Sequence, residues 1–327
     1  MNEIPLPAPS TGPSPVRPST QPPAVGPVAT SRRGGLWRDT AGQVLRQRSA
    51  RMGLTILGLL VFVAVFAPII ATHDPDGRLL GVEQGVKQRE APCIHLLGCP
   101  EDQPQHLFGT DGNFRDVFSR VVFGARTSLV VGFAAIGFAI IVGTTIGALA
   151  GYIGGGLDNL LMRLMDIVLA FPALLLAIAI VTAVGASLAN ALLAIALVSV
   201  PIYARIARAS VLSTKESDYV TASRALGESG FGILTRRIMP NSITPLVVQG
   251  TLGIGGAVLE IAALAFVGVT GDLNRPEWGS MIGLERNQLF NAPHVILAPG
   301  VAIILTVLGF NLLGDGLRDA LDPRLNR

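Results

Sequence analysis

Runs of apolar residues without charge constrain this chain more than any other feature of its sequence. Four runs are free of Asp, Glu, Lys and Arg, and a fifth carries only Glu260; they cover residues 52–71, 127–157, 167–204, 295–314 and, with Glu260, 246–269. About 20 such residues cross the hydrocarbon core of a bilayer as a helix, and a charge at mid-depth costs about 2.5 kcal/mol or more on insertion scales. The sequence therefore predicts an integral membrane protein.

The number of membrane-spanning helices follows from the lengths of these runs. Residues 167–204 are too many for one span, and they break at Gly185-Ala-Ser187 into a third helix and a fourth joined by a tight hairpin. Residues 127–157 fit one helix as far as Ala150, followed by a Gly-rich turn. We therefore expect an all-α integral membrane fold, a six-helix transmembrane bundle.

Composition agrees with this class and excludes another. Half of the 327 residues are hydrophobic and 14% are charged, whereas soluble domains carry about 25% charged residues. The net charge of +3 is the small difference between 25 basic and 22 acidic side chains. So small an excess provides no basic face for nucleic acid, and nucleic-acid binding is excluded.

Residues 1–50 differ in composition from the rest of the chain. The first 30 residues hold nine of the 22 prolines and no apolar run, which predicts a disordered tail. The following Arg-rich segment, 31–51, is typical of a stretch that lies on an anionic inner leaflet. A cleaved signal peptide would begin its apolar core much nearer the first residue, so we expect residues 51–72 to remain as the first transmembrane helix.

Six spans place both ends of the chain on one side of the membrane, and positive charge indicates which side. The tail, the turn after the second span, the loop 205–244 and the C-terminal end together carry 17 of the 25 Lys and Arg residues. The opposite side, which includes the long loop 73–126, carries eight. Since Lys and Arg favour the cytoplasmic side, we expect cytoplasmic N- and C-termini, an extracytoplasmic loop at 73–126 and a five-helix core at 127–324.

The loop at residues 205–244 is far more polar than a hairpin connection requires. Thr214 or Ser217 could cap a helix that runs through residues 218–226. Gly227 then tolerates the left-handed geometry that often follows a helix. We therefore expect a short cytoplasmic helix in this loop.

A second short helix is predicted between Ser229 and Pro240, with Phe231, Leu234 and Ile238 on one face. Two short helices joined by a Gly turn form a compact knob, and a folded knob can transmit force, whereas a disordered loop cannot. The alternative is that both helices simply pack on the inner face of the bundle.

The sequence of this loop resembles a known motif. The run Asp218-Tyr-Val-Thr-Ala-Ser-Arg-Ala-Leu-Gly227, followed by Ile238-Met-Pro-Asn241, resembles the EAA loop of binding-protein-dependent ABC transporter permeases. Thr221 stands where that family usually has Glu, and Ser223 stands where it has its second Ala.

Two further stretches resemble the dipeptide/oligopeptide branch of this family. They are Gly109-Thr-Asp111 with Arg115-Asp116, and the ending Gly314-Asp-Gly-Leu-Arg-Asp-Ala-Leu-Asp-Pro323. Phe114 stands where a Gly is common in the branch. The resemblance covers about residues 50 to 324.

The resemblance implies a permease subunit of the type I ABC importer kind, in a bacterial inner membrane. Besides membrane lipid, the partners it implies are a second homologous permease, two ABC ATPase subunits and an extracytoplasmic substrate-binding protein. ATP-driven closure of the ATPases would move the segment 217–240 and switch the permease between outward and inward opening. The contact residues expected for the ATPase are Tyr219, Thr221, Ala222, Ser223, Leu226, Gly227 and Pro240.

Neither a nucleotide site nor an enzyme active site is expected on this chain. A Walker A loop needs a Gly-rich run that ends in Gly-Lys-Ser/Thr, and neither Lys87 nor Lys215 follows one. ATP and Mg²⁺ are therefore expected on the partner ATPases, with no cofactor here. His73, His106 and His294 are scattered among loops without a nucleophile or orienting acid at a useful spacing, so no catalytic residue is predicted.

Three more residues carry hypotheses. Glu260 lies near the middle of the fifth span, where a carboxylate needs water or a partner; contact with the translocation path and pairing between helices are both open. Cys93 and Cys99 lie in the loop 73–126, where a disulfide and two free thiols are equal alternatives. Only His95 lies between them, so no metal site is expected there.

The substrate is indicated only by the resemblance, which favours di- or oligopeptides, although permeases of this branch also serve nickel and other small solutes. A function from another class, an ion-coupled secondary transporter, would require coupling-ion ligands at mid-membrane and usually an inverted repeat. A third hypothesis is a membrane scaffold or sensor that uses the loop 205–244 as a docking site.

Overall fold

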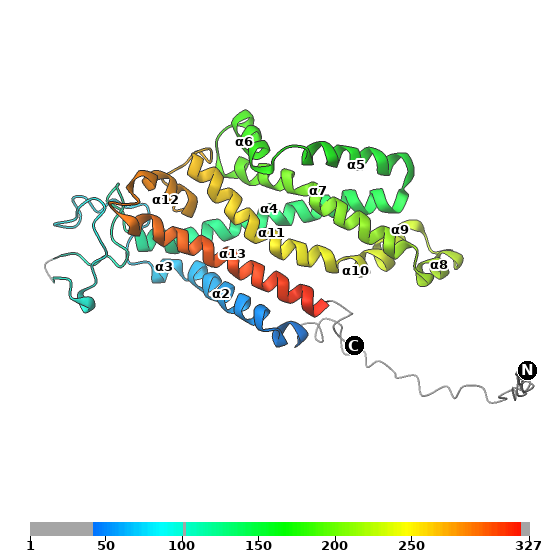
Figure 1. Ribbon diagram of the computed structural model, residues 1–327, viewed down its shortest axis with the longest axis horizontal. Coiled ribbons are helices and arrows are strands. Elements are labelled where there is room, and N and C mark those ends of the chain that lie inside the picture. The colour runs from blue at the N-terminus through cyan, green and yellow to red at the C-terminus, as the bar shows by residue number, and fades with distance from the viewer. Residues whose placement is uncertain (1–41, 101–102, 322–327) are drawn as a thin grey trace, which may run out of the picture.

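The computed structural model describes residues 42–100 and 103–321 (Figure 1). Most of the expected disordered tail, residues 1–41, lies outside the described residues, as do residues 322–327 of the expected core. The described chain folds into helices, as expected. In chain order they are α2 (Arg48–Val65), α3 (Ala67–Ile70), η1 (His95–Leu97), α4 (Val117–Ile153), α5 (Gly155–Leu169), α6 (Ala173–Val184), α7 (Leu188–Lys215), α8 (Asp218–Ala225), α9 (Gly230–Gly232), η2 (Ile233–Ile238), α10 (Met239–Ser242), α11 (Thr244–Val267), α12 (Trp278–Glu285), η3 (Arg286–Gln288) and α13 (Pro293–Leu321).

Within the described residues, five helices are long and apolar enough to cross a membrane, namely α2, α4, α7, α11 and α13. A sixth span exists only if α5 and α6 count as one, and these two helices are bent by 90° relative to each other. The third helix, expected between residue 167 and the hairpin, is thus divided: α5 ends at Leu169 and α6 begins at Ala173. Pro172 stands at the break, where its missing N–H and its effect on the preceding residue end a helix.

Helices α4 and α7 extend beyond the charge-free runs that predicted them, whereas α2 ends at Val65, short of the end of its run at residue 71. α4 begins ten residues before Thr127 and includes Arg120, whose side chain is fully buried. The guanidinium of Arg120 donates to the carbonyl oxygens of Pro75 (2.7 Å) and Asn274 (3.0 Å), which satisfy its charge inside the protein. α7 likewise continues past Ala204 to Lys215. The runs thus locate the apolar middle of each helix and not its ends.

Close packing of α4 along α7 forms the centre of the bundle. At Gly143, an added Cβ would lie 2.6 Å from the carbonyl oxygen of Val200 and 2.8 Å from Cβ of Tyr203, so only glycine permits this approach. Small residues at such contacts are typical of membrane helices, where packing rather than water exclusion drives association.

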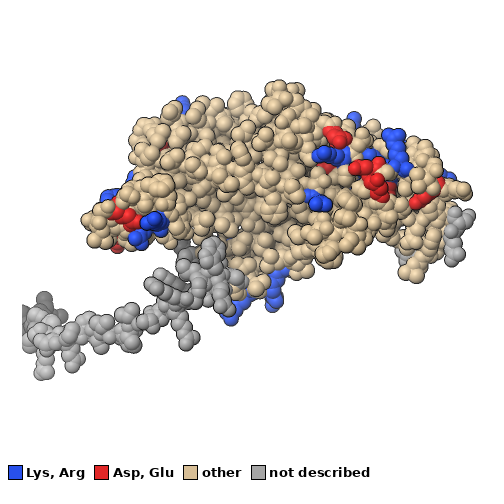
Figure 2. Space-filling view, turned by 180° about the vertical axis from the view of Figure 1, so that it is seen from behind, with Lys and Arg blue, Asp and Glu red and all other residues tan. Residues whose placement is uncertain are grey.

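The two ends of the described chain lie at the same end of the bundle. Ala50 of α2 packs against Ala320 of α13 in a small apolar cluster. Helices α8 and α9 lie toward this end, whereas residues 72–116, here called the 72–116 loop, and α12 lie at the opposite end (Figure 1). Charged side chains gather toward these two ends and leave a broad uncharged band between them (Figure 2).

Candidate functional site

Residues 216–243, here called the knob, form the folded projection that joins α7 to α11. Ser217 precedes α8 in an extended conformation, although its side chain makes no capping hydrogen bond. Gly227 follows α8 with φ of +83°, the left-handed geometry that favours glycine. The Ser229 hydroxyl then accepts a hydrogen bond from the Gly232 N–H (3.2 Å) and starts the second helical segment.

A small apolar core fixes the knob to the bundle. The side chain of Val220 on α8 is fully buried and belongs to a cluster with Ile233 and Ile238. Val211 of α7 and Ala148 of α4 complete this cluster, so both central helices contact the knob. The knob is therefore a folded extension of α4 and α7 rather than a loose connection.

The second helical segment differs from the one that the sequence predicts. Residues Ile233–Ile238 form a π-helix, in which hydrogen bonds join residues five apart and the 3.6-residue period no longer holds. Ile233 and Ile238 are buried, whereas Phe231, expected on the buried face, is 78% exposed. The segment also does not stop at Pro240: this residue lies in the first turn of α10, where a missing N–H costs nothing.

The seven residues expected to contact an ATPase all lie on the knob. Tyr219, Thr221, Ala222, Leu226, Gly227 and Pro240 are exposed, and Ser223 is half-buried. Leu226, at 88% exposure, lies near the turn that separates α8 from α9. The Tyr219 hydroxyl accepts a hydrogen bond from the Asn241 side-chain amide (3.0 Å) and braces α8 against α10. The knob thus has a buried side that holds it in place and an exposed side with large apolar groups.

Two ion pairs that sequence reasoning missed join α5 to α7. The guanidinium of Arg208 donates to both carboxylate oxygens of Asp158 (2.5 and 2.6 Å), and Arg205 donates to Asp166 (2.5 Å). A bidentate pair of this kind is stronger than a single contact. The partners are 50 and 39 residues apart in the chain, so no local pattern reveals them.

Glu260 lies in the apolar helix α11, as the sequence predicts, and is half-buried. Within the part of the chain that the structure describes, its carboxylate makes no hydrogen bond and no ion pair. A second helix of this chain therefore does not supply its partner among the described residues.

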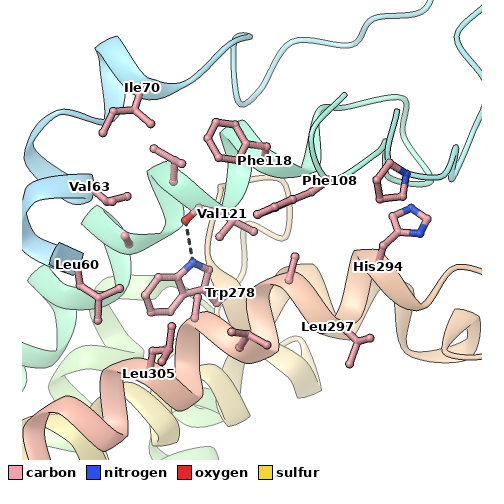
Figure 3. A pocket seen from close by; sticks show the side chains of 16 residues that line it. Leu60, Val63, Ile70, Phe108, Phe118, Val121, Trp278, His294, Leu297 and Leu305 are labelled. Carbon is pink, nitrogen blue, oxygen red and sulfur yellow. Dashed lines mark hydrogen bonds between the residues drawn. The ribbon is translucent and has the colours of Figure 1, made fainter. Parts of the chain in front are cut away.

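An apolar cavity of about 470 Å³ opens between α2, α4 and α13 (Figure 3). Leu60, Phe118 and Leu305 are among its lining residues. The indole of Trp278, from α12, lies against it and donates a hydrogen bond to the Val121 carbonyl (2.9 Å). With so apolar a lining the cavity suits hydrocarbon, and it offers little to a polar solute.

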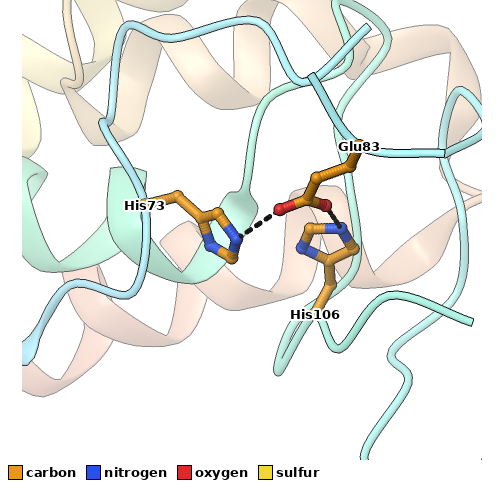
Figure 4. Close-up of side chains that lie close together, drawn as sticks. All are labelled: His73, Glu83 and His106. Atoms are coloured by element: carbon orange, nitrogen blue, oxygen red, sulfur yellow. Dashed lines mark hydrogen bonds and ion pairs between the residues drawn. The ribbon is translucent and has the colours of Figure 1, made fainter. Parts of the chain in front are cut away.

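The 72–116 loop contains the two cysteines and two of the histidines singled out above. Cys93 and Cys99 are joined by a disulfide. The expectation that the histidines are scattered without an orienting acid is wrong for His73 and His106, because both rings face the carboxylate of Glu83 (Figure 4). The ring nitrogen Nδ1 of His106 also lies 3.1 Å from Oδ1 of Asp116.

The pKa values in this cluster are shifted in opposite directions. Burial would lower the pKa of His106, but the hydrogen bond that its ring donates to Asp116 and the charges of Asp116, Glu83 and Glu90 outweigh burial and raise this pKa above its usual value. Burial would raise the pKa of Asp116, and the hydrogen bonds from His106 and Ser119 instead hold it below its usual value. The surroundings therefore favour a positive charge on the His106 ring beside an ionised Asp116.

Two family models match the chain. Residues 143–327 match the binding-protein-dependent transport system inner membrane component, a range that includes the whole knob and Glu260. Residues 35–92 match the N-terminal TM domain of oligopeptide transport permease C.

Curated relatives match this chain over most of its length. The dipeptide transport system permease protein DppC of Alkalihalophilus pseudofirmus is 44% identical over 294 residues, which cover 88% of this chain and 90% of that protein. The glutathione transport system permease protein GsiD of Pectobacterium atrosepticum is 39% identical over 290 residues, 88% of this chain and 91% of that protein.

A solved structure supports the same fold. An inward-facing conformation of the MetNI methionine ABC transporter matches with a TM-score of 0.51 and 20% identity, over 63% of this chain and 98% of that one. The resemblance drawn from the motifs in the knob and the 72–116 loop is confirmed. The chain therefore belongs to the family of binding-protein-dependent transport system inner membrane components, and it is a multi-pass permease subunit of the inner membrane.

Proposed function

We propose that this permease imports short peptides into the cytoplasm as part of an ATP-driven complex. A second permease, two ATPase subunits and an extracytoplasmic binding protein complete that complex, and ATP with Mg²⁺ binds to the ATPases. The names of the relatives support the substrate class, because dipeptides and glutathione, a tripeptide, share a peptide backbone with charged ends.

The exposed side of the knob carries this proposal. Leu226 and Phe231 present large apolar side chains to solvent at 88% and 78% exposure, while Val220 beneath them is fully buried. Exposed apolar groups on a folded element mark a surface that a partner covers. The knob docks on the ATPase through this surface, and closure of the ATPases moves α4 and α7 through the apolar core of the knob.

The distribution of charge supports the direction of transport. The knob and both ends of the described chain lie at one end of the bundle. Together with residues 151–166 and the end of α7 from residue 205, these regions carry 11 of the Lys and Arg residues that the structure describes, against eight in residues 72–126 and 270–294. This end faces the cytoplasm, where such residues accumulate. The 72–116 loop then faces the binding protein, on the side where a disulfide persists.

Glu260 contributes to the translocation path in this proposal. Its carboxylate is half-buried and unpartnered within the described chain, and a carboxylate in a membrane helix faces a water-filled path or a neighbouring subunit rather than lipid. It is a candidate contact for the amino end of a peptide.

Cross-linking tests the docking. Ala222→Cys, on the knob, is expected to cross-link to an ATPase subunit in the assembled complex. The matched control, Val82→Cys, carries the same exposed thiol in the 72–116 loop and is expected not to. Cross-links from residue 222 only to lipid or to the binding protein would contradict the docking.

Uptake measurements test the substrate. Vesicles that hold the complete complex are expected to accumulate labelled dipeptide on addition of ATP, and unlabelled glutathione is expected to compete. Uptake of nickel without competition by peptides would favour the alternative substrate class, and uptake driven by an ion gradient without ATP would favour a secondary transporter.

A further inference from the structure

The cluster of His73, Glu83 and His106 in the 72–116 loop has no part in the proposed transport mechanism. One ligand atom from each residue lies within 4.8 Å of the other two. The Nε2 atom of His73 is 2.9 Å from one oxygen of Glu83, and the Nε2 atom of His106 is 3.3 Å from the other. Figure 4 shows both rings directed at this carboxylate from two different segments of the chain.

The far side of each ring is engaged in a way that leaves Nε2 as the ligand atom. Nδ1 of His106 meets Asp116 (3.1 Å), and Nδ1 of His73 meets the hydroxyl of Thr72 (2.8 Å). When Nδ1 carries the proton and donates it, the lone pair of Nε2 points at Glu83. For His106, which has a carboxylate facing each ring nitrogen, the ring either carries a second proton or binds a cation through Nε2. The Thr72 hydroxyl accepts from Nδ1 of His73 in the tautomer that binds a metal ion through Nε2, and donates to Nδ1 in the other tautomer.

Two buried atoms of the cluster lack a hydrogen bond. His106 is 1% exposed, and its Nε2 has no hydrogen-bond partner among the described residues. Oε2 of Glu83, which lies 3.3 Å from this nitrogen, also has no hydrogen bond within the described chain. Buried polar atoms almost always have a partner, and these two would both be satisfied by the same ion.

We propose that His73, Glu83 and His106 bind a divalent transition-metal ion, with Zn²⁺ the preferred one. Two imidazole nitrogens and one carboxylate oxygen are a common ligand set for Zn²⁺. Bonds of about 2.0 Å in a tetrahedral site place ligand atoms about 3.3 Å apart. This is near the 2.9 Å from Nε2 of His73 to Oε1 of Glu83 and the 3.3 Å from Nε2 of His106 to Oε2 of the same carboxylate. His73 and Glu83 keep 21% and 27% of their side-chain surface exposed, which leaves an entry for the ion and a fourth position for water.

The surroundings hold the three ligands in place. Asp116 orients the ring of His106 through Nδ1, and such a carboxylate behind the ring is common around metal-binding histidines. The same carboxylate also caps α4 by accepting a hydrogen bond from the Ser119 N–H (2.7 Å). The backbone of His106 accepts a hydrogen bond from Cys93 (2.9 Å), next to the disulfide. The bound ion joins the segments that carry His73, Glu83 and His106, and Asp116 connects this cluster to the start of α4.

Metal titration of the complete purified protein tests this site without measuring transport. After removal of metal with a chelator, wild-type protein is expected to bind one Zn²⁺ with a Kd in the micromolar range or below, and Co²⁺ is expected to give the visible absorption of a tetrahedral site. Glu83→Gln, nearly isosteric and partly exposed, is expected to weaken binding about 100-fold, since loss of even outer-shell partners costs 10- to 100-fold.

The matched control is His95→Ala, which removes a histidine of the same loop whose Nε2 instead meets the Gln103 carbonyl (2.8 Å). It is expected to bind Zn²⁺ as wild type does. His106→Ala is expected to lose binding, and Zn²⁺ is expected to slow amide exchange at residues 73–106 in wild type and His95→Ala only. Absence of Zn²⁺ binding in wild type, or equal binding by Glu83→Gln and His95→Ala, would overturn the proposal in favour of protonated rings alone.

Discussion

The 72–116 loop and the knob lie at opposite ends of α4, and they are stabilised by different interactions. The loop is held by a disulfide, by hydrogen bonds between side chains and backbone, and by ionised groups such as Arg120 and Asp116 that are buried at its base. The knob is held by a small apolar cluster and leaves Leu226 exposed. The loop region has internal partners for most of its polar groups, whereas the knob leaves large apolar side chains exposed.

Replacement of Arg120 by Leu is expected to have the largest effect on stability. It would leave the carbonyl oxygens of Pro75 and Asn274 buried without their donor, at a cost of about 3 kcal/mol or more in the free energy of unfolding. Arg126→Leu, an exposed position on the same helix, is expected to change it by less than about 0.5 kcal/mol. Thermal unfolding in detergent measures the stability of both variants. Equal losses of stability would mean that the buried polar contacts of Arg120 do not stabilise the start of α4.

Removal of the disulfide is expected to have the next largest effect. Cys93→Ser with Cys99→Ser opens a short closed loop, which costs about 2 kcal/mol in the chain-entropy treatment. Amide exchange is expected to accelerate around residues 93–106 and to stay unchanged in the knob. Faster exchange in both regions would show that the two ends are not independently stabilised.

Gly227→Val is expected to strain the knob alone. The left-handed backbone at φ of +83° costs an L-residue about 1–2 kcal/mol, and a β-branched side chain is among the least tolerant. ATP-driven uptake is expected to be lost while membrane insertion is retained. Gly227→Asn is the control, because Asn tolerates this conformation; wild-type uptake by the Val variant would remove the coupling role.

Leu226→Ala with Phe231→Ala is expected to have the smallest effect on stability, less than about 0.5 kcal/mol, because both side chains are exposed. Binding of the ATPase subunits, measured by co-purification, is nevertheless expected to weaken strongly. A large loss of stability with intact binding would reverse our interpretation of the exposed surface.

The sequence predicts the membrane-embedded part well because lipid penalises charge. Each of the five unbroken spans overlaps a predicted run, yet the start of α4 was missed because the runs assume that a charge cannot lie in a buried helix. The charge of Arg120 does lie in a buried helix, because backbone carbonyl oxygens of two other segments accept hydrogen bonds from its guanidinium. Such contacts depend on the fold and leave no local pattern.

The candidate sites show the same contrast between features that have a local sequence signal and features that only the fold creates. Helix α8 was predicted from a cap position at Thr214 or Ser217 and from Gly227, which are local signals, and Ser217 does precede it. The π-helix was not, because a 3.6-residue period was assumed for Phe231, Leu234 and Ile238. The histidine cluster was missed because His73, Glu83 and His106 are 10 and 23 residues apart in a segment without regular period, and only the folded loop brings them together.

Helix α4 runs without interruption from Asp116, beside the histidine cluster, to the apolar core of the knob. Its 37 residues make a rod about 55 Å long. A rigid rod cannot tilt at one end and stay still at the other. In the proposed orientation, an antibody that clamps the 72–116 loop against the start of α4 would therefore arrest the transport cycle from the extracytoplasmic side, so an inhibitor would not need to cross this membrane.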